Sequence, residues 1–182
     1  FYNTMSPSMD ILISSNLERL LFSLSNHDDA EVRGYMEELA RSGRYEVSPA
    51  IKGRLEKLFA AGFCDDDQTQ KAIGRMWQEH RYLIDPHTAV AFDVLDQYRR
   101  DTGDTTPTVV VSTASPFKFC TDVLDALGVS DRAQGLDVLD QLSQVTGEPV
   151  PAPLAALRSK ESRFRQTVEK EHMVDAVLGM LE

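Results

Sequence analysis

TVVVSTASPFKF, residues 108–119, is the stretch that decides the fold class. Its three consecutive valines predict a buried strand over Thr108–Ser112, because β-branched residues favour strands and continuous apolar runs are typical of parallel sheets. Ser115 and Pro116 predict that a helix begins next, since a capping hydroxyl followed by proline is a common helix start. Open α/β sheets bind their ligands where such a strand meets such a helix. The stretch therefore predicts an α/β fold with a ligand site at this junction.

Most of the remaining chain carries the signals of helices, so we expect a helix-rich α/β protein with a small number of mostly parallel strands. Leu58–Cys64 fits either the last turn of a helix or a short buried strand, since periodicity does not separate the two. The prolines at 149, 151 and 153 predict an extended connection. Helix starts are expected at Ser15, at Asp28 or Asp29, and at Ser48, Asp65 and Asp85, with two later helices over Leu136–Val145 and Arg163–Leu181.

Composition excludes several classes of partner. The 182 residues carry a formal net charge of −10, which argues against nucleic acid and against an anionic membrane surface. No apolar run approaches the roughly 20 residues that span a bilayer. The two cysteines, Cys64 and Cys120, are too few for a disulfide scaffold and indicate a reducing compartment, so we expect a cytoplasmic protein.

The first residue predicts that the chain is part of a longer protein. Phe1 is neither an initiator Met nor a small residue that remains after Met removal. No charged and apolar leader of the signal-peptide kind follows it. We therefore expect the chain to begin inside a longer sequence.

The DPHTA string, Asp85–Ala89, allows two interpretations. Asp85 before Pro86 predicts a helix start with Asp85 as N-cap and His87 in the first turn. The same residues also suit metal binding or acid–base chemistry. No other histidine has the spacing of a paired metal ligand, which argues against the metal. We expect a structural cap.

The hydroxyls of Ser112 and Thr113 end the predicted strand and also allow two interpretations. They can satisfy the turn and help start the next helix, as is common at such joints. Alternatively, the Thr113 hydroxyl faces the edge of a bound cofactor ring. The spacing alone leaves both interpretations open.

Three strings together resemble the C-terminal part of threonine synthases. They are MSPSMD at Met5–Asp10, DPHTA at Asp85–Ala89 and TASPFKF at Thr113–Phe119. The last is similar to the family's TAHPAKF-like segment, with Ser115 in place of His and Phe117 in place of Ala. The resemblance implies a type II pyridoxal phosphate (PLP) fold, with residues 1–128 in the catalytic fold and residues 129–182 as a helical extension packed on it.

The resemblance also implies roles for individual residues. Thr113 matches the family's partner of the pyridine nitrogen, where a hydroxyl moderates the cofactor's action as an electron sink, and Ser112 beside it is a second cofactor-binding candidate. The departure at Ser115 puts any imidazole-dependent role there in doubt. The substrate-binding candidates are Ser8, Ser14, Ser15, Asn16 and Lys118.

The implied activity is the conversion of O-phosphohomoserine and water to L-threonine and phosphate. None of the lysines, Lys118 included, has the family's setting for the lysine that binds PLP covalently, and no Gly-rich phosphate loop is present. We expect a missing N-terminal part to supply both, and the chain alone to be inactive. Three alternatives remain: another type II PLP lyase such as a threonine dehydratase, a non-catalytic synthase-like protein that binds a phosphorylated metabolite, and a helical interaction module.

Overall fold

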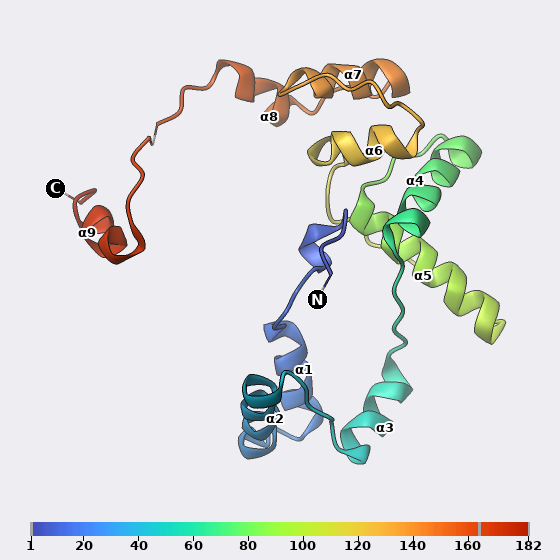
Figure 1. Ribbon diagram of the computed structural model, residues 1–182. Helices are drawn as coiled ribbons and strands as arrows, with labels where there is room; N and C mark the ends of the chain where they lie inside the picture. The colour runs from blue at the N-terminus through green and yellow to red at the C-terminus, as the bar shows by residue number, and fades with distance from the viewer. Residues whose placement is uncertain (1, 164, 182) are drawn as a thin grey trace. The chain divides into compact units, whose positions relative to one another are not determined.

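The computed structural model describes residues 2–163 and 165–181, and the chain divides into two compact units, residues 1–148 and 149–182. Figure 1 shows the helices of both units. The described residues contain helices and irregular segments but no β-strand. Within the same described ranges, no helix combines the length and the apolar character that crossing a membrane requires. The helix-rich character expected from the sequence is confirmed.

Helices α1 (Ser15–Leu24), α2 (Asp29–Ser42) and α3 (Pro49–Leu58) form a small apolar bundle, in which α1 packs on both other helices. Its centre consists of Leu21, Val32, Tyr35 and Ile51. Burying one such aliphatic side chain stabilises a fold by about 1.5–3 kcal/mol. The Tyr35 hydroxyl remains paired, because it donates to Glu31 at 2.6 Å and accepts from the Ser48 amide at 2.9 Å.

The helix starts follow the predicted caps with one correction. Asp28, Ser48, Asp65 and Asp85 are the N-caps of α2, α3, α4 and α5. For α1, the cap is Ser14, whose hydroxyl accepts from the Leu17 amide at 3.3 Å, and Ser15 is already the first helical residue. Two neighbouring serines offer the same cap chemistry, so the capping-box spacing selected the wrong one.

Helices α4 (Asp66–His80), α5 (Pro86–Thr102), α6 (Cys120–Ala126) and α7 (Asp137–Thr146) form the rest of the first unit. Helix α4 packs on α5 and α6, and α7 packs on α6. A Cβ atom at Gly74 of α4 would lie only 3.0 Å from the Ala126 carbonyl oxygen. The absence of a side chain at this position therefore allows α4 and α6 to approach closely.

The strand predicted over Thr108–Ser112 is not observed. This segment has no regular secondary structure, and Val109 and Val111 are 88% and 70% exposed, so the expected buried strand is not confirmed among the described residues. No backbone–backbone hydrogen bond of the described residues involves the segment. Valine favours extended backbone, but a strand also needs a ladder partner, which no other described segment provides.

The helix predicted after Ser115 begins in two steps. Ser115 accepts from the Phe117 amide at 3.3 Å and starts a 3-10 helix over Pro116–Lys118, and α6 follows from Cys120. The predicted cap is confirmed, but the helix that it starts is a separate 3-10 helix and not the first turn of α6. The Phe119 backbone, with φ −129° and ψ 37°, separates the two helices.

Leu58–Cys64 matches neither of its two interpretations, because α3 ends at Leu58 and the following residues are irregular. A Cβ atom at Gly62 would lie 2.8 Å from a Val94 methyl group of α5. The side-chain nitrogen Nε2 of Gln97 donates to the Phe63 carbonyl at 3.0 Å. Contacts with α5 therefore hold this segment without regular structure.

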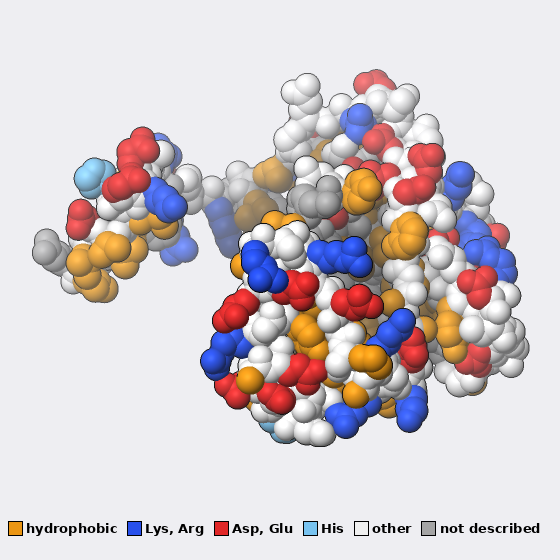
Figure 2. All heavy atoms as spheres, turned by 60° about the horizontal axis from the view of Figure 1, so that its bottom comes forward, with side chains coloured by type: hydrophobic (Ala, Val, Ile, Leu, Met, Phe, Trp, Pro, Cys, Tyr) orange, Lys and Arg blue, Asp and Glu red, His pale blue; other side chains and the backbone are white. Residues whose placement is uncertain are grey.

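The helices among the described residues of the second unit are all short. They are α8 (Ala152–Ala155), α9 (Met173–Leu178) and 3-10 helices over Ala156–Ser159 and Lys170–His172. The extended connection predicted at the prolines ends at Ala152, where α8 begins. The helix predicted over Arg163–Leu181 is largely wrong, since only α9 and the turn before it are helical; residue 164 lies outside the described residues. Apolar side chains of this unit remain exposed (Figure 2), so little burial supports a longer helix.

Candidate functional site

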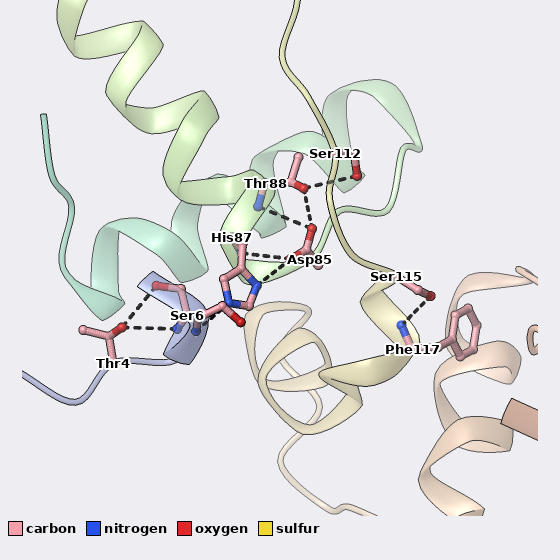
Figure 3. A network of polar contacts seen from close by, with 9 residues as sticks. Thr4, Ser6, Asp85, His87, Thr88, Ser112, Ser115 and Phe117 are labelled. Atoms are coloured by element: carbon pink, nitrogen blue, oxygen red, sulfur yellow. Dashed lines mark hydrogen bonds and ion pairs between the residues drawn. The ribbon is translucent and has the colours of Figure 1, made fainter. Parts of the chain in front are cut away.

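A buried polar cluster surrounds the first turn of α5 (Figure 3). Asp85 is fully buried and accepts four hydrogen bonds. The His87 amide donates at 3.0 Å, the His87 ring nitrogen Nδ1 lies at 2.8 Å, and the Thr88 amide donates at 3.3 Å. The Thr88 hydroxyl is the fourth donor. The N-cap predicted at Asp85 is confirmed, and it does more than cap the helix.

The contacts of His87 define its tautomer. Its Nε2 atom lies 3.1 Å from the Ser8 amide nitrogen. A backbone amide can only donate, so Nε2 carries no proton. The proton of the neutral ring is then on Nδ1 and points to Asp85. The ring also packs edge-on against Phe119, with centroids 4.8 Å apart.

The hydroxyls of Thr88 and Ser112 lie 3.2 Å apart and join α5 to the end of the valine segment (Figure 3). The Thr88 hydroxyl is the donor toward both Asp85 and Ser112. A hydroxyl has one proton, so it serves one of these acceptors at a time. Ser112 is thereby linked to the cluster as an acceptor.

The segment before α1 forms a turn that its own hydrogen bonds stabilise and that contacts this cluster. Asp10 accepts from the amide and the hydroxyl of Thr4, both at 2.7 Å. The Thr4 amide first, and its hydroxyl second, hold the pKa of Asp10 below the ordinary value. The Met5 amide donates to Asp66 at 3.0 Å, at the start of α4. The 3-10 helix Pro7–Met9 is thereby held near the starts of both α4 and α5.

Thr113 follows Ser112, and its exposed side chain makes no hydrogen bond within the described ranges. Lys118 is also exposed, at the end of the 3-10 helix that Ser115 caps. No group of three or more His, Cys, Asp or Glu side chains suited to a metal ion occurs in residues 2–163 and 165–181. Burial raises the pKa of Cys120 to about 11 and also raises that of Cys64, so neither thiol is an activated nucleophile.

The other candidates fall into two places. Ser8 lies in the 3-10 helix Pro7–Met9, bound through its amide to His87. Ser14, Ser15 and Asn16 lie at the start of α1, where Ser14 is the cap and Asn16 accepts from Arg19. No hydrogen bond between described residues links these three side chains to Ser112 or Thr113. The structure thus brings Ser8 and Ser112 to opposite sides of one cluster.

Sequence reasoning missed the cluster itself. It treated Asp85 and His87 as a cap and first turn, which is correct for the helix but omits the contacts to Ser8 and Ser112. The sequence did contain a signal for the cluster, namely Asp, His and Thr together at a helix start, followed by Ala89. If such a helix start is buried, the protein itself must supply a hydrogen-bond partner for every polar group. The turn from Thr4 to Asp10 left no comparable signal.

Known proteins resemble this chain in both sequence and structure. The crystal structure of PLP-bound threonine synthase from Brucella melitensis superposes with a TM-score of 0.70 and 35% identity, covering 90% of this chain and 31% of that chain. Threonine synthase of Saccharomyces cerevisiae is 33% identical over 153 residues, 76% of this chain and 30% of that protein. Threonine synthase-like 1 of Homo sapiens is 34% identical over 128 residues, 70% of this chain and 17% of that protein. The chain therefore corresponds to the smaller part of a longer PLP-binding enzyme structure.

Residues 88–178 match the family described as threonine synthase, C-terminal. The chain belongs to this family. It spans less than a third of the length of the relatives compared above.

Proposed function

We propose that the chain forms the C-terminal side of the active site of a PLP-dependent threonine synthase, which converts O-phosphohomoserine and water to L-threonine and phosphate. The observation that carries the proposal is the likeness to the PLP-bound enzyme over 90% of this chain. The family match over residues 88–178 supports the same reaction. The free thiols of Cys64 and Cys120 fit a reducing, cytoplasmic setting.

Thr113 is the proposed partner of the pyridine nitrogen. The hydroxyl of Ser112 is already paired with that of Thr88, whereas the Thr113 hydroxyl has no partner among the described residues. A ring nitrogen that accepts a hydrogen bond therefore finds its donor in Thr113, with Ser112 as the neighbour that fixes the backbone. These residues fit the ring-nitrogen end of the cofactor.

PLP supplies an electron sink when bound, and a hydroxyl opposite its ring nitrogen moderates that sink without placing a charge there. Thr113 contributes that neutral hydrogen bond. Ser8, Ser14, Ser15, Asn16 and Lys118 are proposed to orient the substrate or its phosphate. Of these, Ser8 has the strongest support, because its backbone is bound to the cluster that also holds Ser112.

The rest of the longer protein is the proposed partner of this chain. It would supply the lysine that binds PLP, the phosphate-binding loop and the strands beside Val109–Val111. The exposure of Val109 and Val111 supports such a neighbour, because valines favour a buried position in a sheet. The chain alone is therefore expected neither to hold PLP nor to turn over substrate.

The test compares the chain with the longer protein that contains it. The longer protein should show the visible absorbance of bound PLP and release phosphate and threonine from O-phosphohomoserine, and residues 1–182 alone should do neither. In the longer protein, Thr113→Asp should change both the cofactor spectrum and turnover, whereas Thr113→Ser should retain most of each. Normal spectra and turnover in both variants would remove Thr113 from the site.

A second candidate is a non-catalytic protein that binds a phosphorylated metabolite. The relatives named threonine synthase-like 1 and threonine synthase-like 2 are the observation that favours it. The two candidates differ in one measurement. A longer protein that binds O-phosphohomoserine but forms no threonine supports the second candidate.

A further inference from the structure

We propose that His87 is a positioning residue, which as the neutral Nδ1-protonated tautomer fixes the Ser8 backbone to the same carboxylate that orients Ser112. The inference rests on the proposed function, because Ser8 and Thr113 matter to catalysis only if this junction is the active site. It gives His87 a role that follows neither from the helix cap at Asp85 nor from the proposed cofactor contacts.

The geometry joins two segments far apart in the chain through one carboxylate. His87 Nε2 accepts a hydrogen bond from the Ser8 amide at 3.1 Å, and His87 Nδ1 lies 2.8 Å from the Asp85 carboxylate. On the other side, Thr88 binds Asp85 and lies 3.2 Å from Ser112. Asp85 thus links Ser8, through His87, to Ser112, through Thr88, although Ser8 and Ser112 do not contact each other through a hydrogen bond.

Burial makes this connection specific. His87 is only 4% exposed and Asp85 is not exposed at all, so water cannot replace a lost partner without a rearrangement. The edge-on contact with Phe119 restricts the ring further. A ring that is held on one edge by Asp85 and packed against Phe119 has one remaining nitrogen, and that nitrogen points to Ser8.

The connection sets where the Pro7–Met9 turn lies relative to Thr113. The turn carries Ser8, and the bond to His87 is made by its backbone, which leaves the Ser8 hydroxyl available to a ligand. If His87 loses its acceptor, Thr4 and Met5 keep their bonds to Asp10 and Asp66, but the turn is no longer tied to α5. Substrate placement should then suffer more than the chemical step.

Two substitutions separate the two nitrogens of His87. His87→Gln keeps an acceptor near the position of Nε2 and loses the donor to Asp85, whereas His87→Asn keeps a donor near Nδ1 and loses the acceptor. Amide hydrogen exchange of Ser8 in the 182-residue chain should be about tenfold faster in His87→Asn and nearly unchanged in His87→Gln. His80→Asn, at an exposed histidine, is the matched control and should leave Ser8 exchange unchanged.

Nitrogen-15 NMR of the imidazole gives a second readout that does not depend on activity. The wild-type chain should have its protonated nitrogen at Nδ1 and its lone-pair nitrogen at Nε2. A proton at Nε2, or fast Ser8 exchange in the wild-type chain, overturns the role of His87. Equal exchange rates in the Asn and Gln variants overturn it as well.

The longer protein then tests the link to catalysis. His87→Asn should raise KM for O-phosphohomoserine by about tenfold with a smaller change in kcat, and His87→Gln should recover most of the loss. A fall in kcat with unchanged KM overturns the positioning role. Failure of the wild-type protein to bind PLP overturns the proposed function instead, and the Ser8 and imidazole measurements separate that outcome from this one.

Discussion

Two buried regions of the first unit are built in opposite ways. The α1–α3 bundle closes on Leu21, Val32, Tyr35 and Ile51. The start of α5 instead buries polar side chains, among them Asp85 and His87. The bundle needs apolar volume at helical spacing, whereas the α5 start needs every donor and acceptor to find a specific partner.

The difference shows which of the two regions tolerates substitution. Apolar packing tolerates exchange between side chains of similar size. A buried polar cluster does not, since one missing partner leaves other groups unsatisfied.

The largest effect is expected from Asp85→Ala. It removes the acceptor of four hydrogen bonds and should lower the free energy of unfolding by about 4 kcal/mol, because buried donors are left without partners. Urea unfolding followed by circular dichroism measures the loss. Asp28→Ala removes an exposed cap of α2 and should cost only about 1 kcal/mol. Equal losses would mean that the polar centre is no more demanding than an ordinary cap.

Leu21→Ala tests the apolar centre. Leu21 is 1% exposed, and its truncation should lower the free energy of unfolding by about 3 kcal/mol through lost burial and the cavity that remains. Leu17→Ala, on the same helix but at a partly exposed position, should cost about 1 kcal/mol or less. A loss at Leu21 as small as that at Leu17 would contradict the packing described for the bundle.

Gly74→Ala probes the contact of α4 with α6. The added methyl group would meet the Ala126 carbonyl, and overpacking against backbone should destabilise the chain by about 1–2 kcal/mol. Gly34→Ala is the matched control in α2, where nothing lies within 4 Å, and should stabilise by about 0.5–1 kcal/mol. The opposite signs are measurable in one thermal unfolding series. Stabilisation by both substitutions would show that α4 and α6 are further apart.

The smallest effect separates two adjacent serines. Ser14→Ala should lower the free energy of unfolding by about 1 kcal/mol, because it removes the hydroxyl that accepts from Leu17. Ser15→Ala, at the first helical position, should change the stability by a few tenths of a kcal/mol at most. A larger loss at Ser15 would restore the cap position that the spacing rule predicted.

Local chemistry explains what the sequence predicted well. The caps at Asp28, Ser48 and Asp65 each bind an amide three residues ahead, so the signal and its partner lie in the same short window. The choice between Ser14 and Ser15 failed because both satisfy that local rule. The predicted helix over Arg163–Leu181 failed because periodicity alone does not supply burial.

Long-range contacts explain what the sequence did not predict. Ser8 and His87 are 79 positions apart, and Thr88 and Ser112 are 24 apart. No local pattern specifies such pairings. The valine run had the composition of a strand, but a strand is a property of at least two segments, and the second segment is not found among the described residues. Thr113 was named as a candidate because its string resembles that of the family, and its cofactor contact stays a prediction.

The open valine segment has a practical consequence for handling the chain. Its amide and carbonyl groups are unpaired within the described ranges, and Val109 projects into solvent. Such a segment is a template on which another extended backbone can add. Preparations of the isolated chain should therefore oligomerise as concentration rises, and co-expression with the rest of the proposed longer protein should keep it monodisperse.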